Sequence, residues 1–172
     1  DGSITMPGTG AAAGTGGDSS GDSSYSYGVW AAGGSGSITV ERGSLTGTGG
    51  SGTTSGGVKA YVSIEVKGGG SLEGTAGAAS ASGGDLWPSS VGVDADHQIT
   101  DQDRGVLTGT GGTAKAGESP AESTGVHGFG ITVRDNGDLT GTAEAAENNS
   151  VRSSATSMGV TAGDLGITVQ DN

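Results

Sequence analysis

Four carboxylates stand within ten residues of one another near the middle of the chain, at Asp94, Asp96, Asp101 and Asp103. Carboxylate oxygens are the ligands that calcium prefers in proteins, so the segment is a candidate calcium site. The spacing differs from that of an EF-hand loop, and no Gly-Gly-x-Gly-x-Asp repeat is present. A solvated acidic strand and turn is therefore the alternative interpretation. No other cofactor is expected.

Other residue types that catalyse reactions are few and show no pattern. His97 and His127 are the only histidines, and the chain has no cysteine. No Gly-x-Ser-x-Gly stands between a strand and a helix, as a nucleophile elbow requires, and no glycine-rich stretch has the downstream lysine of a phosphate-binding loop. We therefore expect no enzymatic activity.

The charge of the chain limits its partners. Nineteen acidic and seven basic residues give a formal net charge of −12 at pH 7. Because phosphate contacts need clustered Lys and Arg, we expect no binding to nucleic acid. No stretch approaches the roughly 18 consecutive apolar residues of a membrane span, so membrane insertion is not expected either. The acidity favours solubility, and we expect an extracellular or cell-surface location.

Three weaker signals concern surface ligands. An exposed Trp87-Pro88 pair could bind carbohydrate, although a place in the core or at a subunit contact is the simpler interpretation for aromatic residues this scarce. Asn148-Asn149-Ser150 fits a glycosylation acceptor, so surface glycans are possible partners. Thr-Gly-Thr triplets at 46–48, 108–110 and 140–142 would align in stacked units, and such an array resembles those of ice-binding solenoids. Threonine is also simply a good polar strand residue.

The composition raises the question of whether the chain folds at all. Glycine supplies 39 of the 172 residues, whereas Leu, Ile, Val and Phe together supply only 26, or about 15%. Such a low share of large apolar residues with a high net charge is typical of disordered chains. The regular placement of these apolar residues argues against disorder.

An internal repeat organises the apolar residues. Four segments consist of an isoleucine block followed seven or eight residues later by a block of the form Gly-x-Leu-x-Gly-Thr. The unit is about 27–37 residues long. The six isoleucines are Ile4, Ile38, Ile64, Ile99, Ile131 and Ile167, and the leucines of the second blocks are Leu45, Leu72, Leu107 and Leu139. We treat residues 1–172 as one repeat domain of about five units.

Both blocks alternate with the two-residue period of a half-buried strand. Val62, Ile64 and Val66, for example, point one way, and the residues between them point the other way. The Gly-, Ala-, Ser- and Thr-rich regions between units are either loops or further short strands, and the Ala- and Glu-rich start of the last one could form a short helix. These regions are residues 10–24, 49–57, 76–85, 111–124 and 143–157.

A loop that ends in glycine joins the two blocks of each unit. These turn glycines are Gly43, Gly70, Gly105 and Gly137. We expect a three-residue hairpin loop with glycine in the left-handed conformation, or a shorter Arg42-Gly43 loop in the case of Gly43. The same glycine could equally turn the corner of a β-solenoid. The predicted fold is all-β with little or no helix: repeated hairpin units in a β-sandwich-like or β-solenoid fibre subunit.

The two ends of the sequence complement one another. The last residues, with Ile167, Val169 and Asn172, stop where a turn should come, and the first residues supply a turn glycine, Gly2, followed by Ile4 in the position of the repeated leucine. The start also lacks a signal peptide and resembles the middle of a longer chain. These five residues are the predicted subunit junction.

Together these features predict a structural subunit of an extracellular filament. Copies of the chain would be its partners, associating head to tail by completing one another's strands. A repeat segment of a long bacterial surface adhesin or phage tail fibre is the first alternative, and an ice- or carbohydrate-binding β module is the second.

Overall fold

The computed structural model describes residues 2–21, 23–82, 86–148, 150 and 153–170. Across these residues the chain forms strands and turns and no helix, which confirms the all-β prediction. Parts of the small-residue regions form further short strands. One of these strands lies inside 143–157, so the helix considered there is absent from its described residues.

The strands belong to three parallel sheets, here named A, B and C. Sheet A contains β1 (Ile4–Met6), β3 (Tyr25–Ala31), β4 (Ile38–Val40), β6 (Thr54–Ala60), β7 (Ser63–Val66), β10 (Ser89–Asp101), β13 (Ala121–Arg134) and β16 (Ala155–Gln170). Sheet B contains β2 (Ala11–Thr15), β5 (Ser44–Thr48), β8 (Ser71–Thr75), β11 (Val106–Gly111) and β14 (Asp138–Ala143). Sheet C contains β9 (Ala79–Ala81), β12 (Ala114–Ala116) and β15 (Ala146–Asn148).

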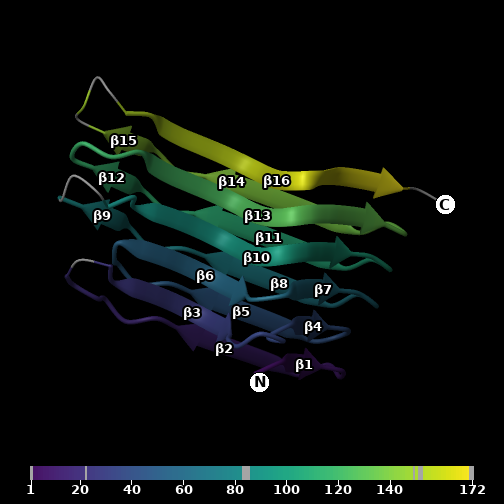
Figure 1. The fold of residues 1–172 in the computed structure, drawn as a ribbon. Helices are drawn as coiled ribbons and strands as arrows, with labels where there is room; N and C mark the ends of the chain where they lie inside the picture. The colour runs from purple at the N-terminus through teal and green to yellow at the C-terminus, as the bar shows by residue number, and fades with distance from the viewer. Residues whose placement is uncertain (1, 22, 83–85, 149, 151–152, 171–172) are drawn as a thin grey trace.

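The chain passes from one sheet to another along each coil, although β3 and β4, and likewise β6 and β7, follow one another within sheet A. Each strand pairs with its equivalent in the next repeat. This arrangement is a β-solenoid of about five turns, with coils stacked from the N-terminal β1 to the C-terminal β16 (Figure 1). The solenoid alternative is therefore confirmed, and the hairpin alternative is wrong. Val66 and Leu72, for example, belong to β7 and β8 in different sheets, although both side chains are buried in the same core.

The two repeated blocks form continuous ladders through the coils. The six isoleucines pair in register from Ile4 to Ile167, and the leucines pair in sheet B. Ile4 pairs with Ile38, so its assignment to the leucine position was wrong; Ala12, which pairs with Leu45, occupies that position. The reason is the offset of seven or eight residues between the blocks, which also separates Ile4 from Ala12.

The turns between sheets A and B differ from the prediction in their backbone. Three of them have two consecutive residues with positive φ, namely Gly68 and Gly69, Asp103 and Arg104, and Asp135 and Asn136. The residue that follows each pair donates its N–H to the carbonyl of the residue that precedes the pair, as Gly137 does to Arg134 at 2.9 Å. This is the geometry of a type I′ turn. The glycine that follows has no positive φ, so the left-handed conformation predicted for Gly43, Gly70, Gly105 and Gly137 was wrong.

The turn glycines are needed for space instead. A Cβ on Gly137 would lie 2.5 Å from the carbonyl oxygen of Asp101, and one on Gly70 would lie 2.7 Å from that of Val40. Each glycine therefore lets its turn lie directly on the strand end of the coil before it.

Glycine has a second role inside the solenoid, where two ladders of glycines face each other. In sheet A they are Gly28, Gly57, Gly92, Gly125 and Gly159, and in sheet B they are Gly14, Gly47, Gly74, Gly109 and Gly141. A Cβ on Gly92 would lie 2.7 Å from the carbonyl carbon of Gly109, so no larger residue fits. The two sheets therefore approach to backbone contact along this line.

A ladder of buried serines stands beside the glycines and joins successive coils. Ser90 Oγ donates to the carbonyl oxygen of Gly77 and accepts from the N–H of Gly112, both at 2.8 Å. Ser26, Ser55 and Ser123 donate to glycine carbonyls in the same way. On one side of these ladders lies the Ile, Leu and Val core, and on the other a small cluster of alanines from sheet C and β13.

One ionisable residue occupies an inward position of the aliphatic core. Asp101 stands in the ladder between Val66 and Val133 and is fully buried. Among the described residues, neither of its carboxylate oxygens has a hydrogen-bond partner. Burial and then the negative charge of Asp138 raise the pKa of Asp101 to about 7. The carboxyl group is therefore protonated in the folded protein at moderately acidic pH.

This pKa makes the stability depend on pH. The pKa of Asp101 is higher in the folded protein than in the unfolded chain. The contribution of its protonated form to stability is therefore fully present below the ordinary aspartate pKa and is lost as the pH rises through about 7. We expect Asp101→Asn and Asp101→Val to be more stable than the parent above pH 7 by about 1–3 kcal/mol. The difference in free energy of unfolding between Asp101→Asn and the parent should become smaller toward pH 5. Urea unfolding at both pH values measures this, and a parent protein equally stable at pH 5 and 8.5 would contradict it.

Candidate functional site

The outward face of sheet A carries a cluster of four interacting charged or ionisable side chains. Lys59 on β6, Asp94 on β10 and His127 on β13 are paired in register on successive coils. Lys59 Nζ donates to Asp94 Oδ2 and to Asp96 Oδ1, and His127 Nδ1 lies 2.8 Å from Asp94 Oδ1. We call Lys59, Asp94, Asp96 and His127 the charged cluster.

The members of the charged cluster stabilise one another's charged forms. Burial would raise the pKa of Asp94, but the hydrogen bond with His127 and the charge of Lys59 outweigh it, so this pKa is lowered. Burial likewise opposes the charge of Lys59, yet Asp94 and Asp96 raise its pKa. The hydrogen bond to Asp94 raises the pKa of His127, against a smaller opposite effect of burial.

The Asp94–His127 pair has the form of the acid–base half of a catalytic triad, and Thr161 is the nearest ladder residue whose hydroxyl could complete it. Thr161 is the next residue in the same ladder. Its hydroxyl donates to Met158 Sδ at 3.3 Å rather than to the imidazole. The geometry therefore supports an ordered, polar surface with one exposed imidazole edge, not an activated hydroxyl.

The four carboxylates predicted to bind calcium are not brought together. Asp94 and Asp96 belong to the charged cluster, whereas Asp101 points into the core and Asp103 lies in a turn with positive φ. In the described part of the chain no group of three or more His, Asp or Glu side chains is arranged to hold a metal ion. The structure therefore gives the calcium interpretation no support.

The threonine triplets do align, on the outward face of sheet B. Thr48, Thr75 and Thr110 are in register with Thr15 below and Thr142 above, which makes an unbroken ladder of five. A neighbouring ladder, formed by the residues two positions before these threonines on each strand, is less regular. It consists of Ala13, Thr46, Glu73, Thr108 and Thr140.

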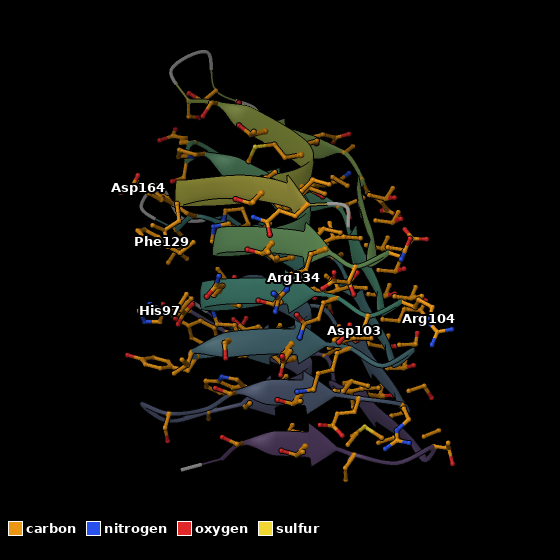
Figure 2. The ribbon with its side chains drawn as sticks, turned by 90° about the vertical axis from the view of Figure 1, so that its right-hand side faces the viewer. His97, Asp103, Arg104, Phe129, Arg134 and Asp164 are labelled. Atoms are coloured by element: carbon orange, nitrogen blue, oxygen red, sulfur yellow. The ribbon has the colours of Figure 1, made fainter. Side chains whose placement is uncertain are left out.

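The aromatic residues are not core residues. The buried core contains only aliphatic side chains and alanine, whereas Tyr25, Trp30, Tyr61, Trp87 and Phe129 are all exposed to a large extent. Trp87 remains exposed, although Pro88 beside it is buried. Figure 2 shows Phe129 projecting from the same side of the solenoid as His97 and Asp164, away from the turn that carries Arg104.

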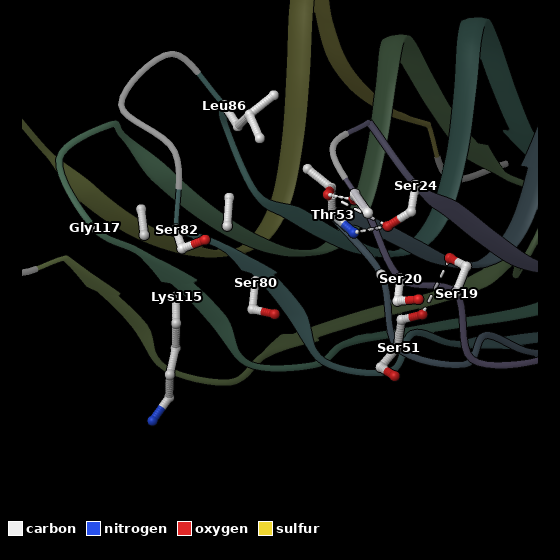
Figure 3. Close-up of a pocket in the computed structure, with 14 residues that line it drawn as sticks. Ser19, Ser20, Ser24, Ser51, Thr53, Ser80, Ser82, Leu86, Lys115 and Gly117 are labelled. Atoms are coloured by element: carbon white, nitrogen blue, oxygen red, sulfur yellow. Dashed lines mark hydrogen bonds between the residues drawn. The ribbon is translucent and has the colours of Figure 1, made fainter.

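A hydroxyl-rich hollow of about 580 Å³ lies at the sheet C side, and its lining extends from Ser19 to Gly117 (Figure 3). Ser19, Ser51, Ser80 and Ser82 line it together with Lys115, which forms an ion pair with Glu147 at 3.2 Å. Asn148, the predicted glycosylation acceptor, is on β15, and its Nδ2 is buried without a hydrogen-bond partner among the described residues. A buried amide is poorly placed for modification; Asn149 lies outside the described residues.

The predicted junction residues lie on the first and last coils. Gly2 donates its N–H to Ala32, and Ile4 is on β1, whereas Ile167 and Val169 are on β16 and are 53% and 69% exposed. Asn172 lies outside the described residues. No helix in the described part of the chain has the length and hydropathy of a membrane span. No family model, curated protein or solved structure matches this chain.

Sequence reasoning missed the charged cluster because its members are about 35 residues apart. The repeat contains the signal: Lys59 and Asp94 each stand five residues before a ladder isoleucine, and His127 stands four before one. A comparison of equivalent positions between units, rather than of neighbouring residues, brings them together.

The hydrogen bond between Asp94 and His127 generates a titration prediction. Its contribution to stability is present below the unfolded pKa of His127 and is lost as the pH rises through the raised, folded value. We expect Asp94→Asn to lower the pKa of His127, as measured by NMR of the imidazole protons, with His97→Gln used to assign the two signals. Asp96→Asn is the matched control because it leaves the Asp94–His127 contact in place. Identical titration curves in Asp94→Asn and the parent would refute the assignment.

Proposed function

We propose that the chain is a structural subunit of an extracellular fibre, in which solenoids stack end to end with β16 of one copy against β1 of the next. The observation that carries the proposal is the register of the ladders in the first and last coils. Ile4 and Met6 at one end occupy the same positions as Ile167 and Val169 at the other. A second copy would continue both ladders without a change of register.

The direction of the backbone hydrogen bonds also supports such stacking. Met6, Val40 and Val66 each accept, on their carbonyl oxygen, an N–H from the next coil. In a parallel sheet both polar groups of one residue bond to the same neighbour. If β16 follows this pattern, the N–H and C=O of Val169 point away from β13 and toward the open edge. On β1 the corresponding open groups belong to Thr5, whose C=O would accept from the N–H of Val169. The C=O of Val169 would face Pro7, which has no N–H to donate, so the two edges are complementary only in part.

The joint between two copies would be small. β1 has only three residues, and on the first coil no described strand stands below β3. Interfaces of this size are weak unless further contacts form. We therefore expect fibres at high protein concentration rather than a stable pair of subunits in dilute solution.

Blocking one edge tests the proposal. Proline lacks the N–H that stacking needs, and at Val169 that N–H faces the open edge, so the coil itself should stay folded. We expect Val169→Pro to raise the concentration needed for fibre formation at least about tenfold, which corresponds to ~1.4 kcal/mol. Negative-stain electron microscopy and light scattering measure it. Val169→Ala, which keeps the N–H, is the matched control.

Two outcomes would count against self-assembly. Fibres formed equally well by Val169→Pro would show that β16 is not the contact. A parent chain that remains monomeric at millimolar concentration would favour the alternative, a segment of a longer surface adhesin or tail fibre whose further coils belong to the same polypeptide.

The threonine ladder favours a second candidate, binding to the ordered surface of ice. Adjacent parallel strands place the five hydroxyl and methyl groups at a repeat of about 4.8 Å on a flat sheet face. Glu73, which is exposed in the neighbouring ladder, interrupts the array. We expect Thr110→Tyr to remove most of any thermal hysteresis, whereas Thr100→Tyr on sheet A should leave it unchanged. Absence of hysteresis and of ice-crystal shaping in the parent would exclude this candidate.

A further inference from the structure

We propose that the aromatic residues on the outward face of sheet A form a binding track for an uncharged polysaccharide. The track consists of Tyr25, Tyr27, Trp30 and Tyr61, and it lies beside the charged cluster. Its residues belong to neither β1 nor β16, the two strands whose edges the fibre proposal uses.

The rings form one group across two adjacent coils. Tyr25, Tyr27 and Trp30 are all on β3, and the rings of Tyr27 and Trp30 have centroids 5.3 Å apart. Tyr27 lies over Gly56 of the next coil, where a Cβ would overlap its ring. Trp30 is paired with Lys59, two residues before Tyr61, which makes Trp30 and Tyr61 diagonal neighbours.

Packing does not explain this placement. Tyr25, Trp30 and Tyr61 are 63%, 55% and 47% exposed, while the core is filled by Ile, Leu, Val and Ala. Exposed, clustered aromatic surface is characteristic of binding sites. The gathering of four of the six aromatic residues of the chain in one place therefore points to a ligand.

The charged cluster supplies fixed polar atoms next to the rings. Lys59 is partly buried and contacts Asp94 and Asp96, and the side chains of Asp96 and His127 are 38% and 41% exposed. Since Asp94 contacts Nδ1 of His127, the ring's Nε2 remains available at the surface. Carboxylate, imidazole and phenol groups beside ring faces can accept and donate hydrogen bonds to sugar hydroxyls, while the rings contact the apolar face of the sugar.

The charge and shape of the face narrow the class of ligand. A net charge of −12 and the carboxylates of the cluster repel anionic polymers. None of the four track residues lines the hydroxyl-rich hollow described above. An open row of rings with polar groups beside it suits an extended neutral chain better than a small ligand or a purely apolar protein surface.

Affinity electrophoresis in gels that contain a soluble neutral polysaccharide tests the proposal. Mixed-linkage β-glucan, galactomannan and starch are the probes, and alginate is the anionic comparison. All variants in this measurement also carry Val169→Pro, so that fibre formation does not contribute to the retardation. A failure of the polysaccharide proposal can then be distinguished from a failure of the fibre proposal. We expect retardation by at least one neutral polymer, and a loss of about tenfold in affinity for Trp30→Ala and for Tyr61→Ala. Trp87→Ala, which removes an exposed tryptophan outside the track, should bind like the parent.

Thermal unfolding of each variant shows whether the coil is intact, and Tyr61→Ala keeps the test valid if Trp30→Ala unfolds. The proposal is overturned if no neutral polymer retards the parent, if only alginate does, or if Trp87→Ala loses binding as much as the track variants do. Self-association that is abolished by Trp30→Ala, without polysaccharide binding, would instead assign the track to contacts between copies of the chain.

Discussion

The backbone contact between sheets A and B determines the rest of the structure. Gly92 faces Gly109, and a Cβ at Gly92 would lie 2.7 Å from the opposite carbonyl carbon. Since the same pair recurs on each coil, the interior narrows along one line and widens on either side of it. Ile and Leu fill the wider side toward the turns, and alanine fills the side toward sheet C. The serine ladder beside the glycines satisfies backbone groups that no water can reach.

This cross-section explains why the composition resembles that of a disordered chain. A solenoid needs only one or two large apolar residues per sheet and coil, because each coil contacts only its neighbours and the ladder, not the single coil, makes the core. The 39 glycines are accordingly not a sign of flexibility. Many of them mark positions where backbone meets backbone, and the entropy lost in ordering them is offset by in-register pairing along the whole stack.

The sequence was sufficient to predict the strands of the two repeated blocks and their ladder positions from Ile38 to Leu139, since alternation and the offset between Ile64 and Leu72 are local properties. It could not separate hairpin from solenoid, because both place Val66 and Leu72 in one core. The charged cluster escaped prediction because Lys59, Asp94 and His127 meet only when coils stack in parallel register. The aromatic residues were misplaced for a related reason: scarcity suggests a core role, but the glycine contact leaves no interior space for a ring.

In a solenoid the packing constrains the inward-facing residues of each coil much more than the outward-facing ones. The surface can therefore carry varied chemistry. Outward positions can change from one coil to the next without altering the register that inward positions impose. The charged cluster does so, as does the ladder that contains Ala13, Thr46 and Glu73. Asp101 is the exception, an ionisable group in an inward position. Because the stability of stacked coils is a sum of neighbouring interfaces, its desolvation weakens only the two interfaces that β10 makes with β7 and β13. The remaining ladders keep the coil in place, so the fold tolerates one buried carboxyl group. A second one on the same coil would add its own desolvation cost to that of Asp101.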